Sequence, residues 1–200
     1  EEPINSYLNY SKDIFKNWDS EQVLMNRFRN DKNLVFCPLV DTSKAENVQS
    51  MFSGCVNLIQ VPLIDTSSVV HFDDMFYNCN SLTTIPQFNT SSLYSANLML
   101  AGCSKLVSVP LMDFGKAEQL RSMLLGCSEL TDLKGFTNLS VSLDLSSSRK
   151  LTADSIMNVI NEAKDLSETG SATLTLGSTN ISKLTEEQIA IASAKGWTLA

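Results

Sequence analysis

Cysteine and methionine are the residues whose types and spacing could do chemistry in this chain of 200 residues. Each recurs every 24 residues, in two rows: Cys55, Cys79, Cys103 and Cys127, and Met51, Met75, Met99 and Met123. Regular cysteines could hold zinc, but tetrahedral ligation needs thiolates that converge on one point. Residues at a fixed interval line up instead, and the chain has no Cys-x-x-Cys pair. We therefore expect no metal here.

Disulfides are the second possible use of these cysteines. Neighbouring turns of a stacked repeat lie about 5 Å apart. Parallel side chains on such turns would hold the two Cβ atoms farther apart than the roughly 3.8 Å that a bridge prefers. We therefore expect free thiols, buried because cysteine is small and apolar. Cys37 should also lie in the core, since it stands where other repeats have Val61, Ile85 and Val109.

Nucleophilic catalysis would have to use His71, the single histidine. A Ser-His or Cys-His arrangement needs the imidazole within hydrogen-bond reach of the nucleophile and a third group to orient it. His71, however, occupies a position that other repeats fill with polar residues that we expect at the surface, namely Asn47, Ser95 and Gln119. The carboxylate pairs Asp73–Asp74 and Glu186–Glu187 are sequence neighbours whose side chains should diverge. We expect no enzyme activity and no cofactor.

A row of oxygen ligands also recurs, as Asp41, Asp65, Asn89 and Asp113. Such a row could bind calcium. Alternatively, Asp-Thr-Ser at a corner accepts hydrogen bonds from its own backbone amides, which requires no metal. The second interpretation is the expected one.

These residues must be positioned by a repeated element, because leucine and proline keep the same interval. The two rows are Leu34, Leu58, Leu82, Leu106 and Leu130, followed by Pro38, Pro62, Pro86 and Pro110. A fixed period of roughly 20 to 30 residues indicates one supersecondary unit stacked on copies of itself, each burying an apolar edge against the next. Each unit should contain a strand, a corner and a return segment.

The chain divides into three parts of one continuous α/β domain. Residues 1–32 have helical spacing and should form an N-terminal cap, with a second helix that includes Leu24 and Phe28. Residues 33–139 hold the repeats, the fifth of them degraded. Residues 140–200 should close the stack with a strand at 143–145, a helix capped by Thr152, a strand at 173–176 and a helix from Thr185 to Gly196.

Charge and hydropathy limit the possible partners. The net charge of −7 should repel nucleic acid. No apolar run approaches the roughly 20 residues of a membrane-spanning helix. The segment Glu1-Glu2-Pro3 has no feature of a signal peptide, so we expect that any export signal has been removed or never existed.

The block Met-Phe-x-x-Cys-x-x-Leu, present at residues 51–58 and 75–82, resembles the BspA-type leucine-rich repeat, and residues 151–197 resemble the C-terminal cap of its gut-bacterial members. The resemblance implies a right-handed leucine-rich repeat solenoid in a secreted or cell-surface bacterial protein. It implies binding of a protein or glycan at the cell exterior, as in adhesins, with no catalytic residues. The alternative is a structural spacer or a surface or phage-like assembly component; the oligomeric state stays open.

A binding surface is expected on the strand face. If Val61 and Leu63 point inward, alternation sends their neighbours outward. The outward rows would be Gln60, Pro62 and Ile64; Thr84, Pro86 and Phe88; Ser108, Pro110 and Met112; and Asp132 and Lys134. The alternative is that proline ends each strand, because it cannot donate to a ladder. Ile64, Phe88 and Met112 would then be buried in the next corner.

Overall fold

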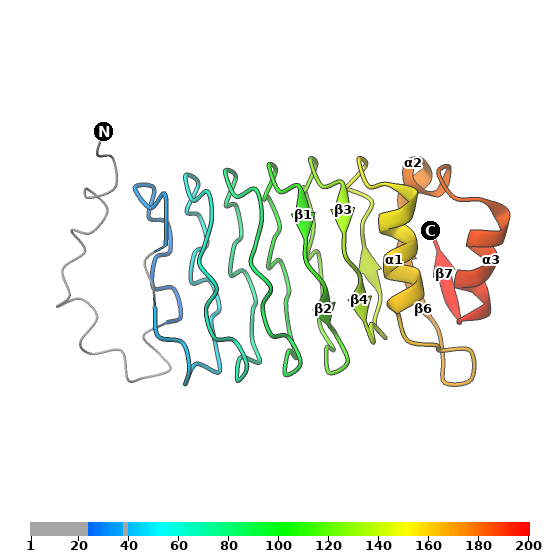
Figure 1. Cartoon of the computed structure of the whole chain (residues 1–200), viewed down its shortest axis with the longest axis horizontal. Helices are drawn as coiled ribbons and strands as arrows, with labels where there is room; N and C mark the ends of the chain where they lie inside the picture. The colour runs from blue at the N-terminus through cyan, green and yellow to red at the C-terminus, as the bar shows by residue number, and fades with distance from the viewer. Residues whose placement is uncertain (1–23, 38–39) are drawn as a thin grey trace.

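The computed structural model describes residues 24–37 and 40–200, and the chain winds through them in turns that stack side by side along one axis (Figure 1). Each turn has two extended runs. We call residues 107–113 and their equivalents in the other turns the strand run, and residues 117–126 and their equivalents the return run. A core of leucine, methionine, cysteine and phenylalanine side chains fills the space within the turns.

The strand runs pair in parallel through short elements. Strand β1 (Ser108–Val109) pairs with β3 (Asp132–Leu133), and β2 (Met112–Asp113) pairs with β4 (Phe136–Thr137). Isolated parallel bridges join Phe36 to Gln60 and Thr84 to Ser108. The earlier turns have only such bridges because Pro62, Pro86 and Pro110 have no N–H to donate to the turn before. At the equivalent position the Lys134 amide does donate, to the Val109 carbonyl at 3.1 Å, and there the pairing extends to named strands.

The return runs are joined by backbone hydrogen bonds between successive turns. Parallel bridges connect Asn47 to His71, His71 to Ser95 and Ser95 to Gln119, each pair 24 residues apart. The bonds continue beyond these bridges, as from the Leu100 amide to the Met123 carbonyl at 3.0 Å. The runs bend where backbones are left-handed, in a column formed by Gly54, Asn78, Gly102 and Gly126.

Aromatic rings and sulfur-containing side chains form continuous rows in the core. The rings of Phe28, Phe52 and Phe76 stack with centroids 5.4 Å apart at each step. The four methionines of the predicted row, Met51, Met75, Met99 and Met123, are fully buried. Such close packing of identical residues on successive turns is what a repeated sequence permits.

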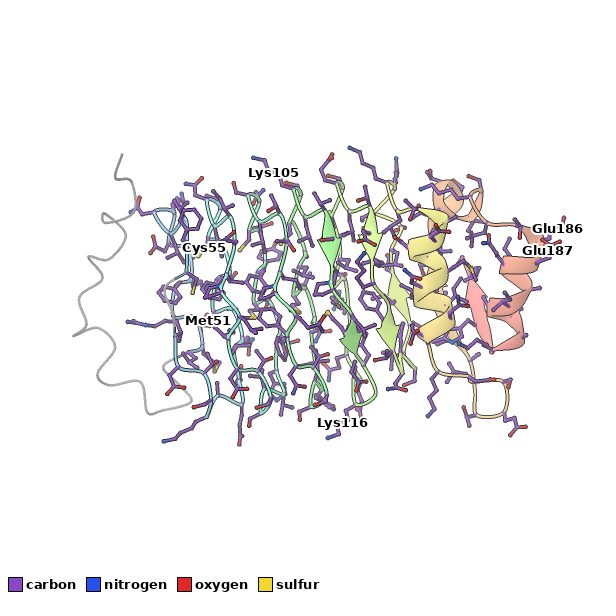
Figure 2. The ribbon with its side chains drawn as sticks, viewed as in Figure 1. Met51, Cys55, Lys105, Lys116, Glu186 and Glu187 are labelled. Atoms are coloured by element: carbon purple, nitrogen blue, oxygen red, sulfur yellow. The ribbon has the colours of Figure 1, made fainter. Side chains whose placement is uncertain are left out.

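The prediction of buried cysteines without disulfides is confirmed for all five. Four of them donate a hydrogen bond from Sγ to a backbone carbonyl of the preceding turn: Cys55 to Phe28 at 2.9 Å, Cys79 to Phe52 at 3.1 Å, Cys103 to Phe76 at 3.2 Å and Cys127 to Leu100 at 3.2 Å. Figure 2 shows Met51 and Cys55 on the first of these turns. The row therefore satisfies carbonyl groups in the core without any disulfide.

The predicted second N-terminal helix is wrong for its described part. Residues 24–30 form turns and not a helix. The amides of Asn26, Phe28 and Asn30 donate to the carbonyls of Gln49, Met51 and Ser53, which is the bonding pattern of the other turns. Phe28 has helical spacing from Leu24, but its ring belongs to the phenylalanine stack. The rest of the predicted cap, residues 1–23, lies outside the described residues.

The C-terminal part contains three parallel strands and three helices. The elements are β5 (Leu143–Asp144), α1 (Ala153–Glu162), β6 (Ala172–Thr175), α2 (Gly177–Ile181), α3 (Glu186–Ala194) and β7 (Trp197–Leu199), with sheet order β5-β6-β7. Helix α1 packs on β3 and β4. The predicted N-caps Thr152 and Thr185 both accept a backbone hydrogen bond. The sequence did not predict α2 or β7. None of the helices among the described residues is long and apolar enough to cross a membrane.

Candidate functional site

Proline reverses the alternation of side chains along the strand run. Val61 is buried as expected, but Leu63 is 66% exposed instead of pointing inward. Ile64, Phe88 and Met112 are only 5%, 2% and 1% exposed, so their predicted place in an exposed stripe is wrong. The alternative interpretation is correct, because the run changes direction at proline and these three side chains enter the core.

The other predicted binding residues lie at or near the surface of the strand run. Gln60, Thr84 and Lys134 are exposed, and the half-buried ones are Pro62, Pro86, Ser108, Pro110 and Asp132. The Lys134 ammonium pairs with the Asp132 carboxylate at 2.7 Å. Their role in binding a partner stays a prediction.

Large apolar side chains also reach this surface; alternation predicts Phe36 to point outward, and the others were not predicted. Five of the eight large apolar side chains exposed among the described residues belong to the strand run: Phe36, Ile59, Leu63, Val107 and Leu111, at 39–66% exposure. We call these five residues the strand face. Monomeric proteins seldom gather exposed apolar groups in one region without a partner. For Leu63 and Leu111 the signal in the sequence was an apolar residue just after Pro62 and Pro110, which alternation had assigned to the core.

A hollow of about 370 Å³ interrupts the strand face beside Gln87, and it opens to solvent. It is lined by Gln87, Phe88, Asn89, Thr90, Ser91, Leu111, Asp113 and Thr137. Gln87 occupies the position of Leu63 and Leu111 in the neighbouring turns, and its Nε2 donates to the Leu111 carbonyl. Its side chain therefore lies along the backbone of the next turn, between two exposed leucines.

The corner carboxylates and amides cap their own turns. Oδ1 of Asp41, Asp65, Asn89 and Asp113 accepts a hydrogen bond from the amide two residues later, at 2.9–3.1 Å. Hydrogen bonds from Ser43 and Ser67 lower the pKa of Asp41 and Asp65 respectively. Among the described residues, no group of three or more histidine, cysteine, aspartate or glutamate side chains could hold a metal ion. The geometry is that of the turn-capping interpretation.

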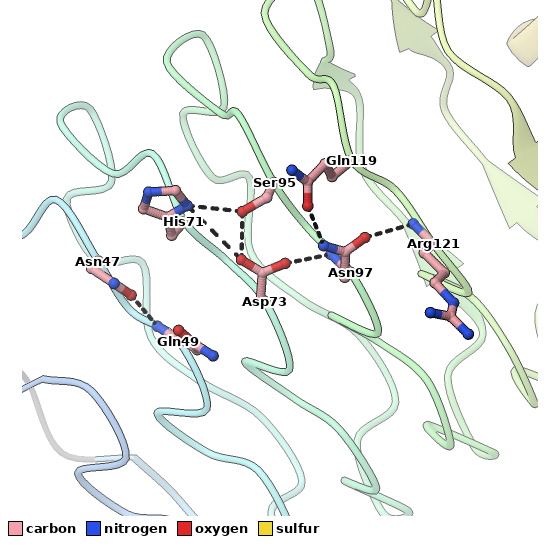
Figure 3. Close-up of polar contacts among 8 residues, drawn as sticks. All are labelled: Asn47, Gln49, His71, Asp73, Ser95, Asn97, Gln119 and Arg121. Atoms are coloured by element: carbon pink, nitrogen blue, oxygen red, sulfur yellow. Dashed lines mark hydrogen bonds and ion pairs between the residues drawn. The ribbon is translucent and has the colours of Figure 1, made fainter.

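A polar network crosses the return runs of several turns (Figure 3). His71 Nδ1 lies 2.9 Å from Ser95 Oγ, and Ser95 Oγ donates to Asp73 Oδ2. The other Asp73 oxygen accepts from the Asn97 amide at 2.9 Å. Asn97 then accepts from the Arg121 amide at 2.9 Å through Oδ1, and its Nδ2 donates to Gln119 Oε1 at 3.1 Å.

This network joins neighbouring turns. Its donors and acceptors are not arranged as in a serine activated by histidine. Because the Ser95 proton points to Asp73, the His71 Nδ1–H must be the donor to Ser95 Oγ. In nucleophilic catalysis the imidazole would instead accept the serine proton, with the carboxylate on its far side. Ser95 is also 3% exposed, so its expected surface position is wrong. The buried hydroxyl is retained because it has two polar partners.

Comparison with proteins of known structure supports the leucine-rich repeat fold. A crystal structure of a leucine-rich repeat protein from T. pallidum matches 88% of this chain and 77% of its own chain, with a TM-score of 0.61 and 17% sequence identity. No curated protein matches the sequence. A family model described as "Mycoplasma protein of unknown function, DUF285" matches residues 6–136. Because that match spans more than half of the chain, the protein belongs to this family of repeat proteins.

Proposed function

We propose that this protein is a non-catalytic leucine-rich repeat module that binds a protein partner through the strand face. The observation that carries the proposal is the gathering of Phe36, Ile59, Leu63, Val107 and Leu111 on one run of the solenoid. Burial of exposed apolar area is the main source of affinity in most protein–protein association. A repeat fold extends such a surface over several turns, which suits a large partner better than a small molecule.

The return run differs from the strand face in a way that supports this proposal. Its exposed side chains are mostly polar, and Asp73, Ser95 and Asn97 are engaged with the neighbouring turns. The proposal includes no cofactor and no catalytic group, since the one histidine belongs to this network.

The finer description of the fold is also a proposal. We infer 24-residue units of the BspA type, wound in the right-handed sense and closed at both ends by capping segments. The Met-Phe-x-x-Cys-x-x-Leu blocks and the parallel bridges between residues 24 apart support it. The resemblance to BspA-type repeats also supports a secreted or cell-surface protein that acts as an adhesin. Protease treatment of intact source cells tests the location, because only an exterior protein would be digested.

Binding to an immobilised panel of fibronectin, laminin, collagen and soluble glycans tests the proposed function. We expect saturable binding to a protein of the panel. The double variant Leu63→Lys/Leu111→Lys should lose it, because two charges would be placed in the apolar contact. The matched control is Leu125→Lys, which changes a 51% exposed leucine of the return run. Retention of binding in the double variant, or its loss in the control alone, would move the site to another face.

A structural spacer or assembly component is the second candidate, because the same exposed apolar residues could pair two copies of the chain. Sedimentation velocity separates the two functions. Concentration-dependent self-association that disappears in the Leu63→Lys/Leu111→Lys variant, without binding to any protein of the panel, would favour the assembly function. A monomer that binds a panel protein would exclude it.

A further inference from the structure

We propose that the hollow beside Gln87 receives an arginine side chain of the protein partner, an inference that rests on the proposed function. The hollow lies in the strand face and interrupts its row of exposed leucines. It thus offers one recessed position beside the exposed side chain of Leu111. Binding energy at protein interfaces concentrates in such pockets, and arginine is among the residues enriched there.

The walls of the hollow fit the aliphatic stem of an arginine. Leu111, with 41% of its surface exposed, lines it on one side. Phe88 is 2% exposed and contributes to the lining from within the core. Long charged side chains bury their methylene groups along apolar surface and keep the charged end at a polar site.

Two acceptors with spare capacity line the polar side of the hollow. Asp113 Oδ1 accepts from the Gly115 amide at 2.9 Å and from Asn138 Nδ2 at 3.1 Å, whereas Asp113 Oδ2 has no hydrogen-bond partner in the described part of the chain. Gln87 uses its Nε2 to donate to the Leu111 carbonyl, so its Oε1 is available as an acceptor. A carboxylate and an amide oxygen together call for a donor-rich cation.

Charge favours arginine over a neutral occupant. The chain carries a net charge of −7, so a basic segment of a partner would be attracted. Lys134, on the next strand run, is already paired with Asp132. A guanidinium has five donors in a planar fork and can reach two acceptors at once, which a lysine ammonium does less specifically.

Two substitutions test the site with little risk to the fold, because each introduces a residue that another turn already has at the equivalent position. Gln87→Leu restores the leucine of Leu63 and Leu111 and removes the Oε1 acceptor from the hollow. Asp113→Asn removes the charge but keeps the turn, since Asn89 caps the equivalent turn through Oδ1 at 3.1 Å. Both variants should fold like the parent chain, which urea unfolding would check.

The first readout uses a blocked arginine amide as the probe and a blocked citrulline amide as its neutral isostere. In NMR titrations of the whole chain we expect the arginine probe to shift the side-chain amide signal of Gln87 and the backbone signal of Asp113. The citrulline probe should not, and Asp113→Asn should abolish the shift. Equal shifts with both probes, or none with arginine, would overturn the inference.

The second readout uses whichever panel protein binds the chain. We expect both Gln87→Leu and Asp113→Asn to weaken that binding roughly tenfold or more, the effect of losing a charge-assisted hydrogen bond at an interface. If Leu63→Lys/Leu111→Lys abolishes binding while these two variants bind as well as the parent, binding through the strand face is supported and the arginine site is wrong. If no panel protein binds, the proposed function fails and the probe titration alone decides.

Discussion

At the scale of single residues, the buried thiols determine how the fold responds to alkali. Burial raises the pKa of Cys37, Cys55 and Cys127 to about 12 and raises the pKa of Cys79 and Cys103 as well. A thiol in the unfolded chain ionises near pH 8.5. Between these values the unfolded chain holds fewer protons than the native protein, so raising the pH favours unfolding. The full contribution of the thiols is present only below about pH 8.5.

Stability should therefore fall steeply above pH 9. Each thiol that stays protonated only in the native state removes about 1.4 kcal/mol per pH unit. Urea unfolding at several pH values from 8 to 11 measures the slope. Lysine and tyrosine also titrate in this range, so the informative quantity is the difference in slope between the parent and Cys103→Ala. The slope of unfolding free energy against pH should be smaller in the variant by about 1.4 kcal/mol per pH unit, the contribution of one thiol. An unchanged slope in the variant would contradict the account.

Glycine in the left-handed column gives a second prediction at this scale. Gly102 and Gly126 have nearly equal φ, 79° and 78°, so an added Cβ strains both backbones alike. At Gly102 that Cβ would lie 2.2 Å from Asn78 Oδ1, whereas at Gly126 the nearest atom is 3.6 Å away. Gly126→Ala should lose about 1–2 kcal/mol of unfolding free energy, and Gly102→Ala should lose clearly more. Equal losses in chemical denaturation would show that the asparagine side chain simply moves aside.

At the scale of elements, a lysine fixes one end of helix α1. Lys195 follows α3, and its Nζ donates to the carbonyls of Ile160 and Asn161 at 2.8 Å each. The last carbonyls of a helix have no partner within the helix, and a cation near them also suits the helix dipole. This contact ties the C-terminus of α1 to a segment more than 30 residues later.

Lys195→Met should cost about 2–3 kcal/mol, because it leaves two carbonyls without their charged donor. We expect faster amide exchange in α1 and little change in the turns before residue 130. Lys116→Met, at an exposed lysine of a corner, is the control and should be neutral. Exchange in α1 that is identical in the two variants would mean that the lysine contact does not hold the helix.

Element prediction from the sequence succeeded where a local signal exists and failed where the next residues redirect the chain. Thr152 and Thr185 marked helix starts because a hydroxyl at the N-cap is a local requirement. The helical spacing of Leu24 and Phe28 misled, because stacking on the next turn places the same two side chains in the core without a helix. Alternation failed after Pro62 since the bend it introduces exchanges the inside and outside positions.

At the scale of the whole molecule, the fixed interval of cysteine, methionine and leucine was enough to predict a solenoid and its core. The candidate site was not predictable in the same way. The hollow beside Gln87 lies at the one position of three where leucine is replaced by glutamine, and its lining comes from three successive turns. The network of Asp73, Ser95 and Asn97 likewise joins residues that the sequence separates by a full repeat.

Hydroxyl-radical footprinting of the chain with and without the panel protein that it binds tests most directly whether the strand face is the binding surface. Leu63, Leu111 and Leu125 are all large, exposed leucines, so their side chains should oxidise readily in the free protein. We expect the partner to lower oxidation of Leu63 and Leu111 and to leave Leu125 unchanged. Protection of Leu125 alone, or of none of the three leucines in a saturated complex, would contradict binding through the strand face.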